Sequence, residues 1–381
     1  MRTTAATRYE QYNRPEPVLH LAFELGQAKW KPGFTTGLGQ RPRERTMAAR
    51  DLRLLAEEIR RAKERFRLAA DARVVSCYEA GREGFWLHRW LVSQGITSHV
   101  VDSASIEVNR RRRRAKSDRL DVGKLLLQLV RYMAGERKVW SVVHVPAVAE
   151  EDQRQLHREL LTVKRDRTRV TNRMKGLLAS QGVVLEVGAT FLAELALVEL
   201  WDGTALPPGL RARLEREWAK VELLTAQIRE LEGEREEVLR RSAAPAVELV
   251  RELLRLRGIG VNSAWLYVME FFGWRGFRNR RQVGGLAGLT PTPYQSGEMS
   301  REQGIAKAGN RYIRAMAIEI AWGWLRYQPE SVLSRWYEER FGQGSSRIRR
   351  IGIVALARRL LVELWRYLET GAVPEGAVLK A

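Results

Sequence analysis

The chain has 381 residues, and its 66 lysines and arginines outnumber its 45 acidic residues, which gives a formal net charge of +21. This excess predicts a polyanionic partner, either nucleic acid or an anionic membrane surface. No apolar stretch reaches the roughly 18 uninterrupted residues of a membrane span, and no signal-peptide core is present. The single cysteine, Cys77, excludes an internal disulfide framework. We therefore expect a cytoplasmic protein that binds nucleic acid and no membrane.

The first third of the sequence predicts an α/β domain, which we bound at residues 1–146. Short apolar runs rich in β-branched residues predict buried strands, and amphipathic stretches between them predict helices. The expected strands are 18–25, 28–37, 72–79 and 97–103, and the expected helices are 49–69, 84–93 and 117–133.

The middle of the sequence, residues 147–245, predicts two long helices at about 150–181 and 210–242. Their apolar residues recur in steps of three and four, which is typical of a coiled-coil seam. Two arrangements fit, an intramolecular helical hairpin or a contact between subunits of a homodimer or homotetramer. The seam residues are Leu156, Leu160, Val163, Val170, Met174 and Leu177 in the first helix, and Leu214, Trp218, Val221, Ile228 and Leu231 in the second.

The last third, residues 246–381, predicts a mainly α-helical domain. It opens with a helix, a tight turn at Gly258 and Gly260, and a second helix, which together resemble a helix-hairpin-helix. Backbone N–H groups near such glycines can bind a phosphate, although the same Gly-X-Gly spacing also occurs at plain helix ends. A loop rich in glycine, serine and threonine then leads into a basic helix.

Two aspartates stand beside a run of five arginines in the stretch "EVNRRRRRAKSDRLDVGKLLL". Asp118 and Asp121 lie three apart at the start of a predicted helix, so their carboxylates can converge on one point. The alternative is that they only complement the helix dipole. The arginine run can hold a nucleic-acid backbone beside the carboxylates, or form a solvated basic loop. Its members are Arg110, Arg111, Arg112, Arg113 and Arg114.

Two further carboxylates are expected at the ends of buried strands. Glu24 is near the end of the first predicted strand, and Glu79 ends a later one. A carboxylate there is costly unless it is paired or bound to a metal. Four acids suit a hard divalent ion, Mg²⁺ or Mn²⁺, and two such ions could stabilise both oxygens of a phosphodiester displacement.

These motifs resemble the DEDD insertion-sequence transposases, the family of the bridge-RNA-guided recombinases and the pilin-gene invertase. The acidic motifs are "FELGQAK", "YEAG" and "KSDRLDVGKL", and the C-terminal motifs are "LRGIGVNSA" and "GLTPTPYQSGEMSREQGIAKAGNRYIR". The resemblance covers about residues 18–364. The family normally has aspartate where this chain has Glu24, which keeps the charge on an arm longer by one methylene.

The resemblance implies a RuvC-like, RNase H-fold catalytic domain with a metal-binding tetrad of Glu24, Glu79, Asp118 and Asp121. It also implies that Ser296 is the nucleophile that forms a covalent link to DNA, with Ser300 as the second candidate. Donor and target DNA and an element-encoded bridge RNA would be the partners. Besides the arginine run and the two turn glycines, the nucleic-acid contacts would be Gly297, Lys307, Asn310 and Arg314.

Two other functions fit the same residues. One is a guide-free, metal-dependent junction resolvase or nuclease that uses only the first domain. The other is an architectural nucleic-acid-binding protein whose carboxylates are structural. Metal-dependent strand cleavage would distinguish the transposase and the resolvase from the architectural protein. A covalent protein–DNA link would distinguish the transposase from the resolvase.

Overall fold

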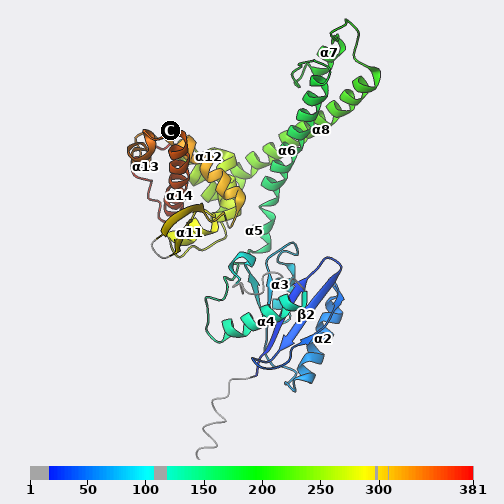
Figure 1. Cartoon of the computed structure of the whole chain (residues 1–381), viewed down its shortest axis with the longest axis vertical. Coiled ribbons are helices and arrows are strands. Elements are labelled where there is room, and N and C mark those ends of the chain that lie inside the picture. The colour runs from blue at the N-terminus through cyan, green and yellow to red at the C-terminus, as the bar shows by residue number, and fades with distance from the viewer. Residues whose placement is uncertain (1–16, 107–117, 297–298, 308, 381) are drawn as a thin grey trace, which may run out of the picture. The chain divides into compact units, whose positions relative to one another are not determined.

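The computed structural model describes residues 17–106, 118–296, 299–307 and 309–380. At 104, 118–121, 293–296 and 299–303 it describes the backbone only. The chain forms two compact units, Met1–Val145 and Pro146–Ala381. Figure 1 shows the first in blue to cyan and the second in green to red. No helix within the described ranges has an apolar stretch that could cross a membrane.

A mixed six-stranded sheet forms the centre of the first unit. Its strand order is β3-β2-β1-β5-β6, and the short β4 also pairs with β2. β1 is antiparallel to β2 and parallel to β5, which is in turn parallel to β6. The strands are β1 (Leu19–Leu25), β2 (Lys29–Thr35), β3 (Arg43–Glu44), β4 (Met47–Ala48), β5 (Val74–Glu79) and β6 (Thr97–Val101).

Helices cover both faces of this sheet, and its central strands β1 and β5 are therefore buried over most of their length. α2 (Leu52–Arg65) and α3 (Trp86–Ser93) pack on the face that carries Phe23 of β1. α4 (Asp118–Met133) packs on the opposite face, which carries Ala22. A short 3-10 turn, η1 (Ser103–Ser105), follows β6. The predicted α/β organisation of the first third is confirmed.

The second unit begins with a long helical hairpin. α5 (Val148–Asp152) and α6 (Gln155–Ala179) lead to α7 (Phe191–Ala196), and α8 (Pro208–Arg241) returns alongside α6 (Figure 1). The two long helices are antiparallel, since Leu160 clusters with Leu231 and Met174 with Leu214. The predicted intramolecular hairpin is observed within the chain, and the contact between subunits stays a prediction. The predicted seam residue Leu177 packs against the cluster of Met174 and Leu214 while partly buried, and Leu178, which was not predicted, is buried in it.

The rest of the second unit is a helical bundle around a large apolar core. A two-stranded sheet of β7 and β8 is its one β element in the described ranges. The predicted helix, tight turn and helix at 245–267 are present as α9 and α10. The elements are α9 (Pro245–Arg255), α10 (Val261–Tyr267), the π-helical turn η3 (Val268–Phe272), α11 (Arg280–Leu286), β7 (Pro291–Ser296), β8 (Met299–Ile305), α12 (Arg311–Tyr327), α13 (Val332–Tyr337), the π-helical turn η4 (Glu338–Gly342) and α14 (Ser346–Thr370).

Candidate functional site

Glu24 and Glu79 lie side by side at the carboxyl edge of the sheet. β1 and β5 are parallel and in register through the pair Phe23 and Tyr78, so the two acids take the next position on each strand. Glu24 is half-buried and Glu79 is exposed. Residues two apart on a strand share a face, and Ala22 belongs to the apolar cluster under α4. Both acids are therefore on the face of the sheet that α4 covers.

The first turn of α4 begins at Asp118 and ends at Asp121, next to this face. Val122, the following residue, approaches the sheet so closely that a Cβ added to Gly33 of β2 would overlap its side chain. One turn later the Cys77 thiol on β5 lies 3.8 Å from the carbonyl oxygen of Leu125. The glycine in β2 thus lets α4 sit close to the strands that carry the two glutamates.

The other predicted members of this site lie outside the described part of the chain. The run Arg110–Arg114 falls in the range 107–117, and the side chains of Asp118 and Asp121 are not described. Among the described residues no group of three or more histidines, cysteines or acids is placed to hold a metal. The structure brings Glu24 and Glu79 together, and the complete tetrad stays a prediction.

Ser296 is the last residue of β7, at the tip of the β7–β8 hairpin. It pairs with Met299, whereas Ser300 pairs with Gln295. Gly297 is one of the two residues that join the strands, and it lies outside the described ranges. Adjacent register positions alternate between faces of a sheet, so the two serines are on opposite faces of the hairpin.

The "KAGNRYIR" motif builds the junction between this hairpin and α12. Gly309 has φ +96°, and a Cβ at this position would overlap the carbonyl oxygen of Leu286. Asn310 caps α12, because its side-chain oxygen accepts hydrogen bonds from the N–H groups of Tyr312 and Ile313 at 2.9 and 3.3 Å. Arg314 donates a hydrogen bond of 3.0 Å to the carbonyl of Lys307. Lys307, Asn310 and Arg314, which are expected to contact nucleic acid, therefore also stabilise the junction between the β7–β8 hairpin and α12.

The turn between α9 and α10 is engaged within the bundle. Gly258 adopts φ +91° and lies against Tyr327. The N–H of Gly260 donates to Ser263 Oγ at 3.2 Å, and the N–H of Ile259 donates to the carbonyl of Leu256. Lys380 Nζ donates to the carbonyl of Ile259 at 2.7 Å. A phosphate bound here would have to replace these internal hydrogen bonds.

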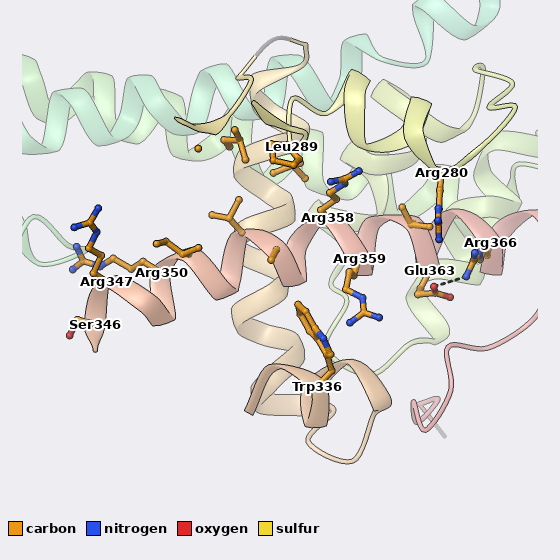
Figure 2. A pocket seen from close by; sticks show the side chains of 17 residues that line it. Arg280, Leu289, Trp336, Ser346, Arg347, Arg350, Arg358, Arg359, Glu363 and Arg366 are labelled. Atoms are coloured by element: carbon orange, nitrogen blue, oxygen red, sulfur yellow. Dashed lines mark hydrogen bonds and ion pairs between the residues drawn. The ribbon is translucent and has the colours of Figure 1, made fainter. Parts of the chain in front are cut away.

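A groove of about 980 Å³ beside the base of the hairpin was not foreseen from the sequence. Figure 2 shows it along α14, with Trp336 of α13 on one side and Leu289 and Arg280 on the other. The α14 residues Arg347, Arg350, Arg358 and Arg366 follow one another in steps of three, eight and eight, a spacing that would have pointed to one side of a helix. The groove arginines are Arg280, Arg347, Arg350, Arg358, Arg359 and Arg366.

Comparison with known proteins places the chain among transposases. The sequence pattern of the Transposase IS116/IS110/IS902 family matches residues 250–336, which span the α9–α10 turn, the serine hairpin and α12. A putative transposase, y4rJ, of Sinorhizobium fredii is 41% identical over 379 residues, covering 95% of this chain and 94% of that protein. The chain belongs to the IS116/IS110/IS902 family of transposases.

Two more distant relatives are transposases of named insertion sequences. The transposase for insertion sequence element IS1328 of Yersinia enterocolitica is 29% identical over 61% of this chain and 68% of that protein. The transposase for IS1111A of Coxiella burnetii is 28% identical over 51% of this chain and 52% of that protein. The expected resemblance to insertion-sequence transposases is confirmed.

Proposed function

We propose that this transposase cuts and rejoins DNA with an acidic metal-binding tetrad and a nucleophilic serine, guided by an RNA from its own element. The observation that carries the proposal is the adjacency of Glu24 and Glu79 on parallel strands, on the face where α4 begins at Asp118. Strands far apart in the sequence meet there, so the four acids of the predicted tetrad come from β1, β5 and α4.

The topology of the first unit supports a RuvC-like, RNase H-fold catalytic domain. β1, β2 and β3 are consecutive antiparallel neighbours, and β5 and β6 extend the sheet in parallel with β1. α4 covers the face of the sheet where the two glutamates lie. This order places Glu24 of β1 and Glu79 of β5 at one edge of the sheet, where ligands of α/β sheets commonly bind.

The donor set suits a hard divalent cation such as Mg²⁺ or Mn²⁺. Glu24 and Glu79 offer oxygen ligands, which these ions prefer, and two neighbouring carboxylates repel each other unless a cation lies between them. Asp118 and Asp121 would complete the ligand set. A bound ion would stabilise the negative charge that develops on the phosphate oxygens during displacement.

Ser296 would supply the nucleophile. In this step the Oγ–phosphorus bond forms, the scissile phosphorus–oxygen bond breaks, the serine proton leaves to a base, and the departing DNA strand ends in a hydroxyl. The bond energy is kept in the new phosphodiester, so a different strand can be joined by the reverse displacement. The position of Ser296 at the end of β7, next to the turn of the hairpin, supports this role.

A nucleic-acid partner is supported by the net charge of +21. The resemblance adds an element-encoded bridge RNA that pairs with donor and target DNA. Purified protein is expected to retain this RNA, and RNase treatment is expected to stop recombination. Recombination that survives RNase treatment would favour the guide-free nuclease or resolvase.

The decisive experiment is a search for the covalent intermediate. End-labelled donor DNA is incubated with the wild type, Ser296→Ala and Ser300→Ala in Mg²⁺ and resolved under denaturing conditions. Wild type and Ser300→Ala are expected to form a protein–DNA adduct, and Ser296→Ala is not. An adduct with Ser296→Ala would remove Ser296 from the mechanism, and metal-dependent cleavage without any adduct would favour the nuclease.

A further inference from the structure

The groove along α14 combines a cationic rim with an apolar floor. The rim holds six arginines, and its single acid, Glu363, is 2.8 Å from Arg366. The floor is formed by side chains from α13, α14 and the hairpin base. The floor residues are Leu289, Pro291, Ile305, Trp336, Ile351, Val354 and Val362.

Three rim arginines are exposed and lack acidic partners. The side chains of Arg280, Arg347 and Arg350 form no hydrogen bond or ion pair with any part of the chain that the structure describes. Many other arginines of this chain do have such partners. On α2, for example, Arg60 and Arg61 both pair with Glu57. Cations gathered without counter-charges along a groove form an electrostatic footprint for a polyanion.

The floor has features that a phosphate alone would not need. Ile351 is 58% exposed within the groove. The Arg359 guanidinium lies 4.2 Å from the centre of the Trp336 ring, so a planar cation is held on an aromatic surface. Nucleobases stack on arginine planes and aromatic rings, and they contact apolar side chains, when they are not paired in a duplex.

We propose that this groove binds a single-stranded segment of nucleic acid, with phosphates on the arginine rim and unpaired bases on the floor. The inference rests on the proposed function, since the occupant would be a strand handled by the transposase. Arg347 and Arg366 are 19 residues apart on α14, about 28 Å at ~1.5 Å per residue. That length accommodates several nucleotides.

The location of the groove connects it to the proposed nucleophile. Pro291 lines the groove and begins β7, and Ser296 ends the same strand. Five residues of extended strand span about 17 Å. A strand bound in the groove would therefore be held at the foot of the hairpin whose tip carries the serine.

Charge complementarity favours this occupant over a second copy of the chain, because a rim of six arginines and one acid calls for an anionic partner and every copy carries a net charge of +21. An acidic peptide would satisfy the rim but would not supply planar groups for the floor. A fully paired duplex would likewise present its phosphates and leave the floor uncovered. These three occupants are outcomes of the test below.

The test measures binding of the full-length protein to three fluorescein-labelled probes. The probes are a 15-nucleotide single-stranded DNA, an RNA of the same sequence, and the corresponding DNA duplex, each followed by anisotropy at several KCl concentrations. The groove variant is Arg280→Gln, Arg347→Gln and Arg350→Gln combined. The matched control is Arg213→Gln, Arg216→Gln and Arg229→Gln combined, which removes three exposed arginines from α8.

The groove variant is expected to bind single strands at least ~10-fold more weakly at 0.15 M salt. Its salt slope should fall by about 2, because each lost phosphate contact contributes about 0.7 on single strands. The control variant should change binding less than ~3-fold. Equal losses in both variants would reduce the groove to part of a general basic surface and overturn the proposal.

A second variant, Ile351→Ser, tests the floor without removing charge or a buried residue. It should weaken single-strand binding about 5-fold or more, while the salt slope and duplex binding stay unchanged. If Ile351→Ser binds single strands as tightly as the wild type does, the proposed contacts between bases and the floor are wrong. If polyglutamate displaces the probe equally well from the wild type and from Ile351→Ser, the groove binds an acidic peptide instead. If light scattering shows that the groove variant no longer forms oligomers that the wild type forms, the groove binds a second copy of the chain.

The two single-stranded probes separate the sources of the strand. Tighter binding of RNA, with the larger loss in the groove variant, identifies a guide loop, and the opposite result identifies a melted DNA strand. Ser296→Ala should bind both probes as the wild type does. Intact single-strand binding without any adduct would contradict the proposed nucleophile alone, and adduct formation without groove binding would contradict the groove alone.

Discussion

Arg158 on α6 binds the carboxylate of Glu270 on η3 with two hydrogen bonds, Nε to Oε1 at 2.5 Å and Nη2 to Oε2 at 2.9 Å. Glu270 is buried, whereas Arg158 is half exposed. On the other helix of the hairpin, Arg235 donates to Asn262 Oδ1 of α10 at 2.6 Å. The hairpin is thus joined to the bundle by polar contacts from both of its helices.

Arg158→Ala is expected to lower the free energy of unfolding by about 2 kcal/mol. The substitution leaves the Glu270 carboxylate without its bidentate partner in a buried position, a costly arrangement that water reduces in part. Arg169→Ala is the control, because Arg169 is 71% exposed and pairs with Asp166 at the surface. It should cost less than about 0.5 kcal/mol in urea unfolding. Equal effects of the two variants would contradict this role of the pair.

His157 makes the stability of the second unit depend on pH. Burial lowers the pKa of His157 to about 4, and the Arg235 guanidinium adds to the shift. Its side chain is buried, and neither ring nitrogen has a hydrogen-bond partner in the described part of the chain. The unfolded chain has a histidine pKa near ~6.5, so between pH 6.5 and 4 the unfolded state binds more protons than the folded state.

The contribution of His157 to the free energy of unfolding is therefore fully present above pH 6.5 and is lost as the pH falls toward 4. Between pH 7.5 and 5 the loss should be about 2 kcal/mol. His157→Leu removes the titrating group, and its free energy of unfolding should fall less than that of the wild type by this amount. Parallel urea titrations of both proteins at the two pH values check the expectation. Identical pH dependences would show that His157 does not titrate differently in the two states.

Gly309→Ala is expected to destabilise the protein by about 2 kcal/mol or more. The residue adopts φ +96° and its Cβ would overlap the Leu286 carbonyl oxygen, and an L-residue strained in this region is costly. Gly233→Ala is the matched control, since Gly233 is in the middle of α8 with open space around it. That change should raise stability by roughly 0.5–1 kcal/mol. Thermal unfolding of the two variants distinguishes a required glycine from a dispensable one.

Glu79→Gln is expected to reduce strand cleavage in Mg²⁺ by about 100-fold or more, because the amide keeps the shape but removes the charge that a divalent ion needs. DNA binding should change less than ~3-fold, since the phosphate contacts remain. Glu64→Gln, an exposed change on α2, is the control. Chelation with EDTA should abolish cleavage and added Mg²⁺ should restore it. Normal cleavage by Glu79→Gln would remove Glu79 from the metal site.

Glu24→Asp tests the one departure from the family pattern. Aspartate keeps the carboxylate and shortens its arm by one methylene, so cleavage in Mg²⁺ should be retained, whereas Glu24→Gln should lose it. Initial rates of cleavage on one labelled substrate compare the two variants. Equal loss in both would mean that the longer arm has become necessary at this sheet edge.

Local patterns in the sequence were sufficient for most of the secondary structure, but the loop expected before α12 was wrong, because this stretch contains the β7–β8 hairpin. The apolar runs that contain β1 and β5 are bounded by residues that disfavour strands, and the periodic apolar residues of α6 and α8 leave one helix face to be buried. The family motifs pointed to the transposases because their glycine, asparagine and arginine residues have local backbone roles. Asn310 caps a helix and Gly309 occupies a conformation that favours glycine.

Contacts between distant segments were decided only by the tertiary structure. The seam of α6 did not specify its partner, which is the antiparallel helix α8. The structure also adds Leu178 to the buried face, beside the predicted Leu177. The adjacency of Glu24 and Glu79 depends on strand order and register, which local periodicity does not encode. The groove joins Arg280 of α11 to Arg347 of α14, two residues far apart in the chain. They share a surface only because the packing of the bundle brings α11 and α14 together beside the base of the β7–β8 hairpin.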